Sequence, residues 1–203
     1  MMSTETAAPA PEATNPDLPA NPTFWNYVGY WFPHLVAFGY ALVILAAIST
    51  QFIGTDMPCP LCVLQRMAMM LIGIAAIWMV GQARKGMLTL AAYARSYGLM
   101  IVAAMLGATM STRQIELHIL PGDAGYGDAV LGLHLYTWAL ITFIVVIAYS
   151  AIMLMFFKPT LPVAPSGTAA LWISRILVWA FIIIIIANVV LIFAEEGFHL
   201  YLP

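Results

Sequence analysis

The chain contains five long runs of apolar residues, separated by short segments that hold most of its charges. About 20 apolar residues are enough for an α-helix to cross the hydrocarbon core of a bilayer. The pattern therefore predicts an all-α integral membrane protein with five membrane-spanning helices. Their expected ranges are 33–52, 60–81, 97–117, 131–157 and 171–194. The third run is the weakest, because it reaches spanning length only by continuing through Arg113.

Composition supports this interpretation and excludes other classes of protein. Hydrophobic residues make up 63% of the chain and charged residues 8%, too few charges to cover the surface of a soluble domain. The net charge is −2 and no basic cluster is present, so we expect no nucleic-acid partner. The chain has two cysteines, and a structural zinc site needs four ligands, so the cysteines alone cannot form one.

The basic residues predict the orientation of the helices. The second and fourth connections carry Arg84, Lys85, Arg95 and Lys158, whereas the first and third carry no lysine or arginine. Cytoplasmic connections are enriched in these residues. We therefore expect a cytoplasmic N-terminus, and we expect the first and third connections and the C-terminus to lie outside, where disulfides persist.

The same patterns divide the chain into five parts. Residues 1–23 begin with an Ala/Pro-rich stretch that lacks the features of a secretory signal, and they predict a disordered cytoplasmic tail. Residues 24–32 are dense in aromatic side chains and predict an interfacial segment. A four-helix membrane domain is expected over 33–157 and a Pro-rich cytoplasmic linker over 158–170. The fifth helix and an extracytoplasmic tail occupy 171–203.

Redox chemistry is indicated by Cys59 and Cys62, which stand where a polar turn meets the second apolar run. Pro60 suits the first turn of a helix, so both sulfurs are expected at its N-terminus, where the helix dipole stabilises a thiolate. Arg66 follows Cys62 by four residues and shares its helix face, where its charge favours a Cys62 thiolate. A buried, inert cysteine pair is the alternative, and this placement favours the redox interpretation.

A second polar cluster ends the third run and is expected on the same side of the membrane as the cysteines. It contains Arg113, Glu116 and His118. Arg113 and Glu116 have the spacing of a helical ion pair, and His118 could relay a proton. His118 and His134 could also join the thiols around a metal, although no spacing between the histidines requires it.

These motifs resemble those of the DsbB family of disulfide-bond-forming quinone reductases. The resemblance rests on PCPLCVLQR at 58–66, which opens the second helix, and on Arg113-Gln114 with His118 near the end of the third. It extends from about residue 35 to 156. It implies a four-helix bundle in the bacterial inner membrane that reoxidises a periplasmic thiol oxidoreductase or other dithiol protein and reduces ubiquinone or menaquinone.

The resemblance also implies roles for individual residues. Cys59 and Cys62 match the catalytic, quinone-coupled pair, with Arg66 beside them. Arg66 and His118 match quinone-contacting positions, and Gln65 and Arg113 lie in the same two motifs as further candidate quinone ligands.

Two features depart from the family pattern. Typical members carry a second cysteine pair between the third and fourth helices, whereas the loop at 121–130 is short and has no cysteine. A fifth helix follows the four-helix domain. These departures leave a rival interpretation open, in which the chain is a non-catalytic accessory subunit of a larger respiratory or transport complex. Membrane lipid is expected around the chain in either case.

Overall fold

A computed structural model describes residues 15–19, 21–54, 59–120, 122, 125 and 129–196 of the chain. Its elements are α1 (Phe24–Gly54), α2 (Pro60–Arg84), α3 (Leu90–Leu117), α4 (Leu135–Met155), the short α5 (Phe157–Thr160) and α6 (Thr168–Glu196). The five long helices are each long and apolar enough to cross a membrane, which confirms the predicted fold class. Residues 1–14, most of the α3–α4 loop and the tail after 196 lie outside the described residues.

Helix ends differ from the sequence expectation where local backbone chemistry sets them. Helix α3 begins at Leu90 because the Thr89 side chain accepts a hydrogen bond from the Ala92 N–H and caps it, well before the apolar stretch starts. Helix α4 begins at Leu135 rather than near 131. Leu131 has φ +53° and Gly132 has φ +80°, values that a right-handed helix cannot contain.

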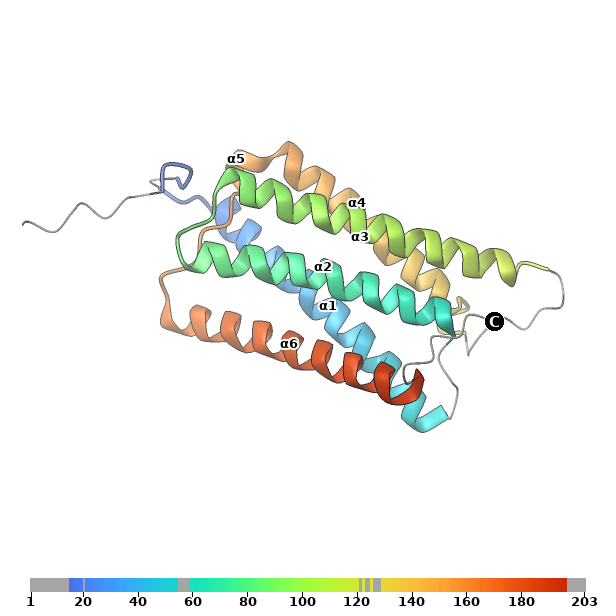
Figure 1. Ribbon diagram of the computed structural model, residues 1–203. Helices are drawn as coiled ribbons and strands as arrows, with labels where there is room; N and C mark the ends of the chain where they lie inside the picture. The colour runs from blue at the N-terminus through green and yellow to red at the C-terminus, as the bar shows by residue number, and fades with distance from the viewer. Residues whose placement is uncertain are drawn as a thin grey trace, which may run out of the picture.

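The helices lie side by side with their long axes roughly aligned (Figure 1). Helix α2 packs against α1 and α3, and α4 packs against α3. The core between them is built from side chains such as Ile44, Ile72, Met100 and Phe143, each fully buried. Helix α6 lies on the outside of this group, where it packs against α1 and α2.

Polar contacts fix α6 to α1. Ser174 of α6 is fully buried, and its hydroxyl lies 2.8 Å from the Tyr30 hydroxyl and 2.8 Å from Nε2 of His34. Both α1 side chains are themselves buried. Buried polar groups are costly unless paired, so this trio specifies where α6 docks along α1.

The α4–α6 connection is also held in place. Asn26 of α1 donates a hydrogen bond of 2.9 Å to the Leu161 carbonyl, and the Tyr93 hydroxyl of α3 lies 2.8 Å from the Thr160 hydroxyl. The first residues of the predicted linker therefore pack against α1 and α3, which sets the point from which the chain enters α6.

A close approach at Gly73 fixes α6 to α2. The Phe181 ring of α6 occupies the space that a Cβ at position 73 would need. We expect Gly73→Ala to lower the free energy of unfolding by about 1–3 kcal/mol, because the ring or the helix must shift. Thermal unfolding in detergent measures this.

Gly81→Ala is the matched control for that prediction, since a Cβ at Gly81 of the same helix meets open space. Phe181→Leu should restore most of the stability that Gly73→Ala loses. Equal melting temperatures for the Gly73→Ala and Gly81→Ala variants would contradict the packing described.

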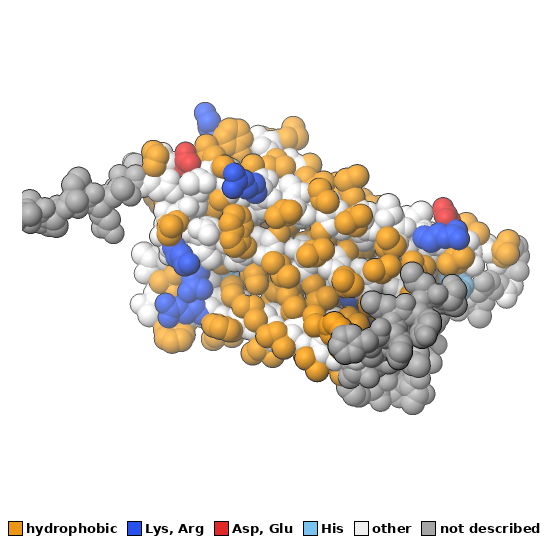
Figure 2. Space-filling model, viewed as in Figure 1, with side chains coloured by type: hydrophobic (Ala, Val, Ile, Leu, Met, Phe, Trp, Pro, Cys, Tyr) orange, Lys and Arg blue, Asp and Glu red, His pale blue; other side chains and the backbone are white. Residues whose placement is uncertain are grey.

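Most of the basic side chains lie near one end of the bundle. On the face shown in Figure 2, hydrophobic side chains cover the middle and most lysine and arginine side chains gather towards the left-hand end. In Figure 1 the N-terminal end of α1 and the C-terminal end of α2 lie at that same end, and α2 starts at the other. The start of α2, where the thiol pair lies, is therefore at the opposite end of the bundle from most of the basic side chains.

Candidate functional site

The two cysteines lie at the start of α2, as the sequence predicts. Cys59 is the N-cap residue, with φ −68° and ψ 148°, and Pro60 occupies the first helical turn. Proline suits this position, because its missing N–H would have no partner within the helix. The Cys59 sulfur accepts a hydrogen bond of 3.2 Å from the Cys62 N–H, so a thiol takes the capping role that an oxygen usually has.

The two sulfurs are in direct contact. They lie 2.9 Å apart, both as free thiols, and both residues are half-buried. The hydrogen bond from the Cys62 thiol lowers the pKa of Cys59 to about 6, and the nearby His118 adds to this effect. The sequence favours a thiolate on Cys62 beside Arg66, whereas the contacts in the reduced pair stabilise one on Cys59.

The amide of Gln114 bridges the pair from α3. Its Nε2 lies 3.3 Å from the Cys59 sulfur and 3.4 Å from the Cys62 sulfur. Gln65 of α2 donates a hydrogen bond of 2.7 Å to Oε1 of Gln114 and so fixes the amide's orientation. Both glutamines are buried, at 5% exposure for Gln65 and 1% for Gln114. Gln114 has a place at the centre of this cluster that the sequence analysis did not assign.

Arg66 of α2 contacts α6. It is buried, and its Nη1 donates a hydrogen bond of 3.5 Å to Oδ1 of Asn188. Asn188 is fully buried, and its Nδ2 lies 3.6 Å from the Met70 sulfur. The fifth spanning helix thus supplies a polar partner to the arginine one turn beyond Cys62, a contact that the sequence analysis also missed.

His118 ends α3 beside a stack of rings. Its ring lies 5.8 Å from that of Tyr136, and the His134 ring lies 5.2 Å from the same tyrosine, all nearly parallel. His118 contributes to the lowered pKa of Cys59, so its side chain lies near the thiols. Among the described residues, no three histidine, cysteine or acidic side chains are grouped so that they could hold a metal ion.

Arg113 lies outside this cluster. Its side chain is 61% exposed, and Nη1 is 3.5 Å from a carboxylate oxygen of Glu116, the helical ion pair that the spacing indicates. The structure therefore brings together Cys59, Cys62, Gln65 and Arg66, with His118 at the edge, and leaves Arg113 on the surface.

The Cys59 pKa leads to a pH prediction. A thiolate is the alkylated species, so the iodoacetamide labelling rate of Cys59 should be high above pH 6 and fall as the pH drops through 6. An ordinary thiol shows this inflection near 8.5. Peptide mass spectrometry of the reduced protein gives the rate for each cysteine. Cys62→Ala removes the donor and should move the inflection upward. An unshifted inflection near 8.5 in the parent protein would count against the hydrogen bond.

The sequence of this chain is similar to that of a known protein family. Residues 30–126 match the family model described as disulfide bond formation protein DsbB. Disulfide bond formation protein B of Chromobacterium violaceum is 37% identical over 89 residues, which are 44% of this chain and 51% of that protein. The match thus spans about half the length of the curated relative. No solved structure matches the chain significantly.

Residues 30–126, just under half of the chain, are thus similar to the DsbB family. The resemblance stated from the two motifs is thereby confirmed. The DsbB region covers most of α1 together with α2 and α3, and it holds the thiol pair, Arg66 and Gln114. Helix α6 lies outside this region, so Asn188, which contacts Arg66, comes from a part of the chain that the family model does not match. The chain has no second cysteine pair of the kind that typical DsbB members carry.

Proposed function

We propose that this protein is a membrane thiol–disulfide oxidoreductase, which passes electrons from an extracytoplasmic dithiol protein through Cys59 and Cys62 to a membrane quinone. One observation carries the proposal. Within the region similar to DsbB, Cys59 caps a membrane helix, its free thiol contacts that of Cys62, and a buried glutamine bonds both sulfurs. A cysteine pair in this setting is favoured for exchange, because the helix terminus and the hydrogen bonds stabilise a thiolate.

The exchange starts from the oxidised pair. A thiolate of the dithiol protein attacks the Cys59 sulfur, the Cys59–Cys62 bond breaks, and Cys62 leaves as a thiolate. The second thiol of the dithiol protein then loses its proton. It attacks the first sulfur of the dithiol protein, the one bonded to Cys59 in the mixed disulfide, and Cys59 is released. The dithiol protein has then lost two electrons, and the pair has gained two electrons and two protons.

Reoxidation of the pair needs a two-electron acceptor. A quinone supplies this chemistry when bound, since it takes up two electrons and two protons to become a quinol. The donor set at the site fits such a group: a buried guanidinium at Arg66, the amides of Gln65 and Gln114, and the His118 imidazole. Hydrogen-bond donors of this kind stabilise an oxygen that gains negative charge.

Each of these side chains has a proposed task. Arg66 holds a carbonyl oxygen and steadies its developing charge, and Asn188 holds Arg66 in place. Gln114 keeps the two sulfurs together. His118 exchanges protons with the aqueous side, where the end of α3 leaves it half-buried. Arg113 remains a candidate quinone contact only through its motif, because its ion pair with Glu116 occupies it at the surface.

The proposed orientation follows from the charges. The thiol end faces the oxidising side of a bacterial inner membrane, with the N-terminus cytoplasmic and the C-terminus outside. With no second cysteine pair in the chain, the dithiol protein reaches Cys59 directly or brings its own shuttle cysteines.

The test uses the full-length protein in detergent. The protein is reduced, freed of reductant and mixed with a soluble ubiquinone analogue, while quinone absorbance and free thiols are followed together. We expect one quinone reduced for each pair of thiols lost. Thiols that stay reduced in excess quinone would overturn the proposal and favour the accessory-subunit interpretation, which co-purification with larger membrane subunits would then support.

A further inference from the structure

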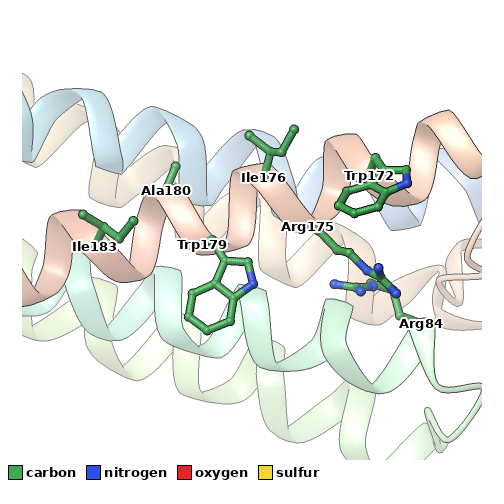
Figure 3. A pocket seen from close by; sticks show the side chains of 7 residues that line it. All are labelled: Arg84, Trp172, Arg175, Ile176, Trp179, Ala180 and Ile183. Atoms are coloured by element: carbon green, nitrogen blue, oxygen red, sulfur yellow. The ribbon is translucent and has the colours of Figure 1, made fainter.

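A second site lies at the opposite end of the bundle from the thiols, where α6 passes the end of α2. A hollow of about 610 Å³ opens there, lined by Arg84 of α2 and by residues of α6. The α6 residues are Trp172, Arg175, Ile176, Trp179, Ala180 and Ile183. Figure 3 shows the Arg84 and Arg175 side chains pointing toward one another beside Trp172.

The charge of this hollow is positive. Two guanidinium groups line it, and no carboxylate of the described residues forms an ion pair with either. Arg175 also lies 5.3 Å from the centre of the Trp172 ring, a cation–π contact that fixes its direction. Two like charges that converge repel each other unless an anion lies between them, so the arrangement favours a bound anion.

The remaining wall is apolar and faces outward. Trp172, Ile176, Trp179 and Ile183 follow one another at helical spacing on one face of α6. Their exposed fractions are 57%, 63%, 62% and 62%, so this face contacts the membrane rather than the bundle. Tryptophans beside arginines at a helix end are typical of the level of lipid headgroups.

We propose that this hollow binds an anionic phospholipid, with its phosphate on Arg84 and Arg175 and an acyl chain along the α6 face. Guanidinium groups bind phosphate oxygens in pairs of hydrogen bonds. Basic pockets between membrane helices are suited to anionic headgroups, whereas a soluble phosphate would gain nothing from the apolar wall. The proposal does not depend on the redox function.

Native mass spectrometry of the delipidated protein in detergent tests the proposal. Phosphatidylglycerol is compared with phosphatidylcholine, and inorganic phosphate is added as a competitor. We expect the parent protein to bind phosphatidylglycerol more tightly by about thirtyfold, given about 1 kcal/mol for each of the two arginines. The variant Arg84→Gln/Arg175→Gln should lose this preference and bind both lipids equally.

The matched control removes two charges near the same end but outside the hollow. Arg95 and Lys158 are both exposed, and neither lines the hollow, so Arg95→Gln/Lys158→Gln should keep the preference. Arg175→Gln alone, at an exposed position, serves if the double variant does not fold. Equal binding of both lipids by the parent protein would overturn the proposal. So would an equal loss in the control, or displacement of the lipid by millimolar phosphate.

Discussion

Cys62→Ser is expected to abolish quinone reduction by the reduced protein. A serine at this position can still donate a hydrogen bond to the Cys59 sulfur, so the local structure should survive, but it cannot form the disulfide that releases two electrons. No quinone should be consumed above the rate of the protein-free mixture. The readout is quinone absorbance in the assay described above, with the melting temperature as the check on folding. Residual stoichiometric reduction would show that the electrons do not come from this pair.

Cys59→Ser should also abolish the reaction, but the two variants should differ towards a disulfide probe. With oxidised glutathione, Cys62→Ser leaves the half-buried N-cap sulfur of Cys59 to form a mixed disulfide that no second thiol resolves. Cys62 lies inside the helix and should react more slowly in the Cys59→Ser variant. Mass spectrometry of the glutathione adducts measures both. Faster labelling of Cys62 would contradict Cys59 as the sulfur that the dithiol protein attacks.

The sequence identifies the position of this pair because two local signals coincide. Pro60 marks a first helical turn and the apolar run begins there, so the cysteines could be placed at the start of α2 before any packing was known. The start of α3 was missed, because a threonine cap outside the apolar run sets it. Caps of this kind are weaker signals than hydrophobic periodicity, since many threonines outside helices look the same in a sequence.

The inward-facing residue of the α3 motif could not be chosen from sequence. Arg113 and Gln114 are consecutive, so their side chains point about 100° apart around the helix. One of them faces α2 and the other faces outward, and the packing of α3 decides which. The structure buries Gln114 at 1% exposure and leaves Arg113 61% exposed. The motif makes Arg113 a candidate quinone ligand, whereas its three-residue spacing to Glu116 favours an ion pair on the helix surface, which the structure contains.

The sequence alone indicates that Asn188 needs a polar partner. It is the one amide in the apolar stretch 181–193, and a polar side chain inside a membrane helix calls for a polar partner. The partner itself could not be named, because Arg66 is 122 positions away and the contact depends on how α6 docks. That docking is set by Ser174 on α1 and by Phe181 on Gly73.

Arg66→Met is expected to slow quinone reduction by about 10²-fold, because it removes the charged donor that steadies a developing negative oxygen. Methionine fills a similar volume, so the side chain's packing between α2 and α6 is largely kept. The readout is the single-turnover rate of quinone reduction at saturating quinone. A variant within about twofold of the parent rate would exclude Arg66 from the electron-transfer step.

Asn188→Leu tests whether the added helix acts through that arginine. If Asn188 positions Arg66, the single variant should slow the reaction by about tenfold, and the double variant with Arg66→Met should be no slower than Arg66→Met alone, since contacting residues are not additive. Asn188→Asp keeps the acceptor for the guanidinium and should restore the rate.

If Asn188 had only a structural role, the results would differ. The two effects would then multiply, the aspartate would not rescue, and the rate would follow the melting temperature. Non-additive rates with rescue at unchanged stability would make α6 part of the redox site, because its amide would then set the direction of the charge beside Cys62.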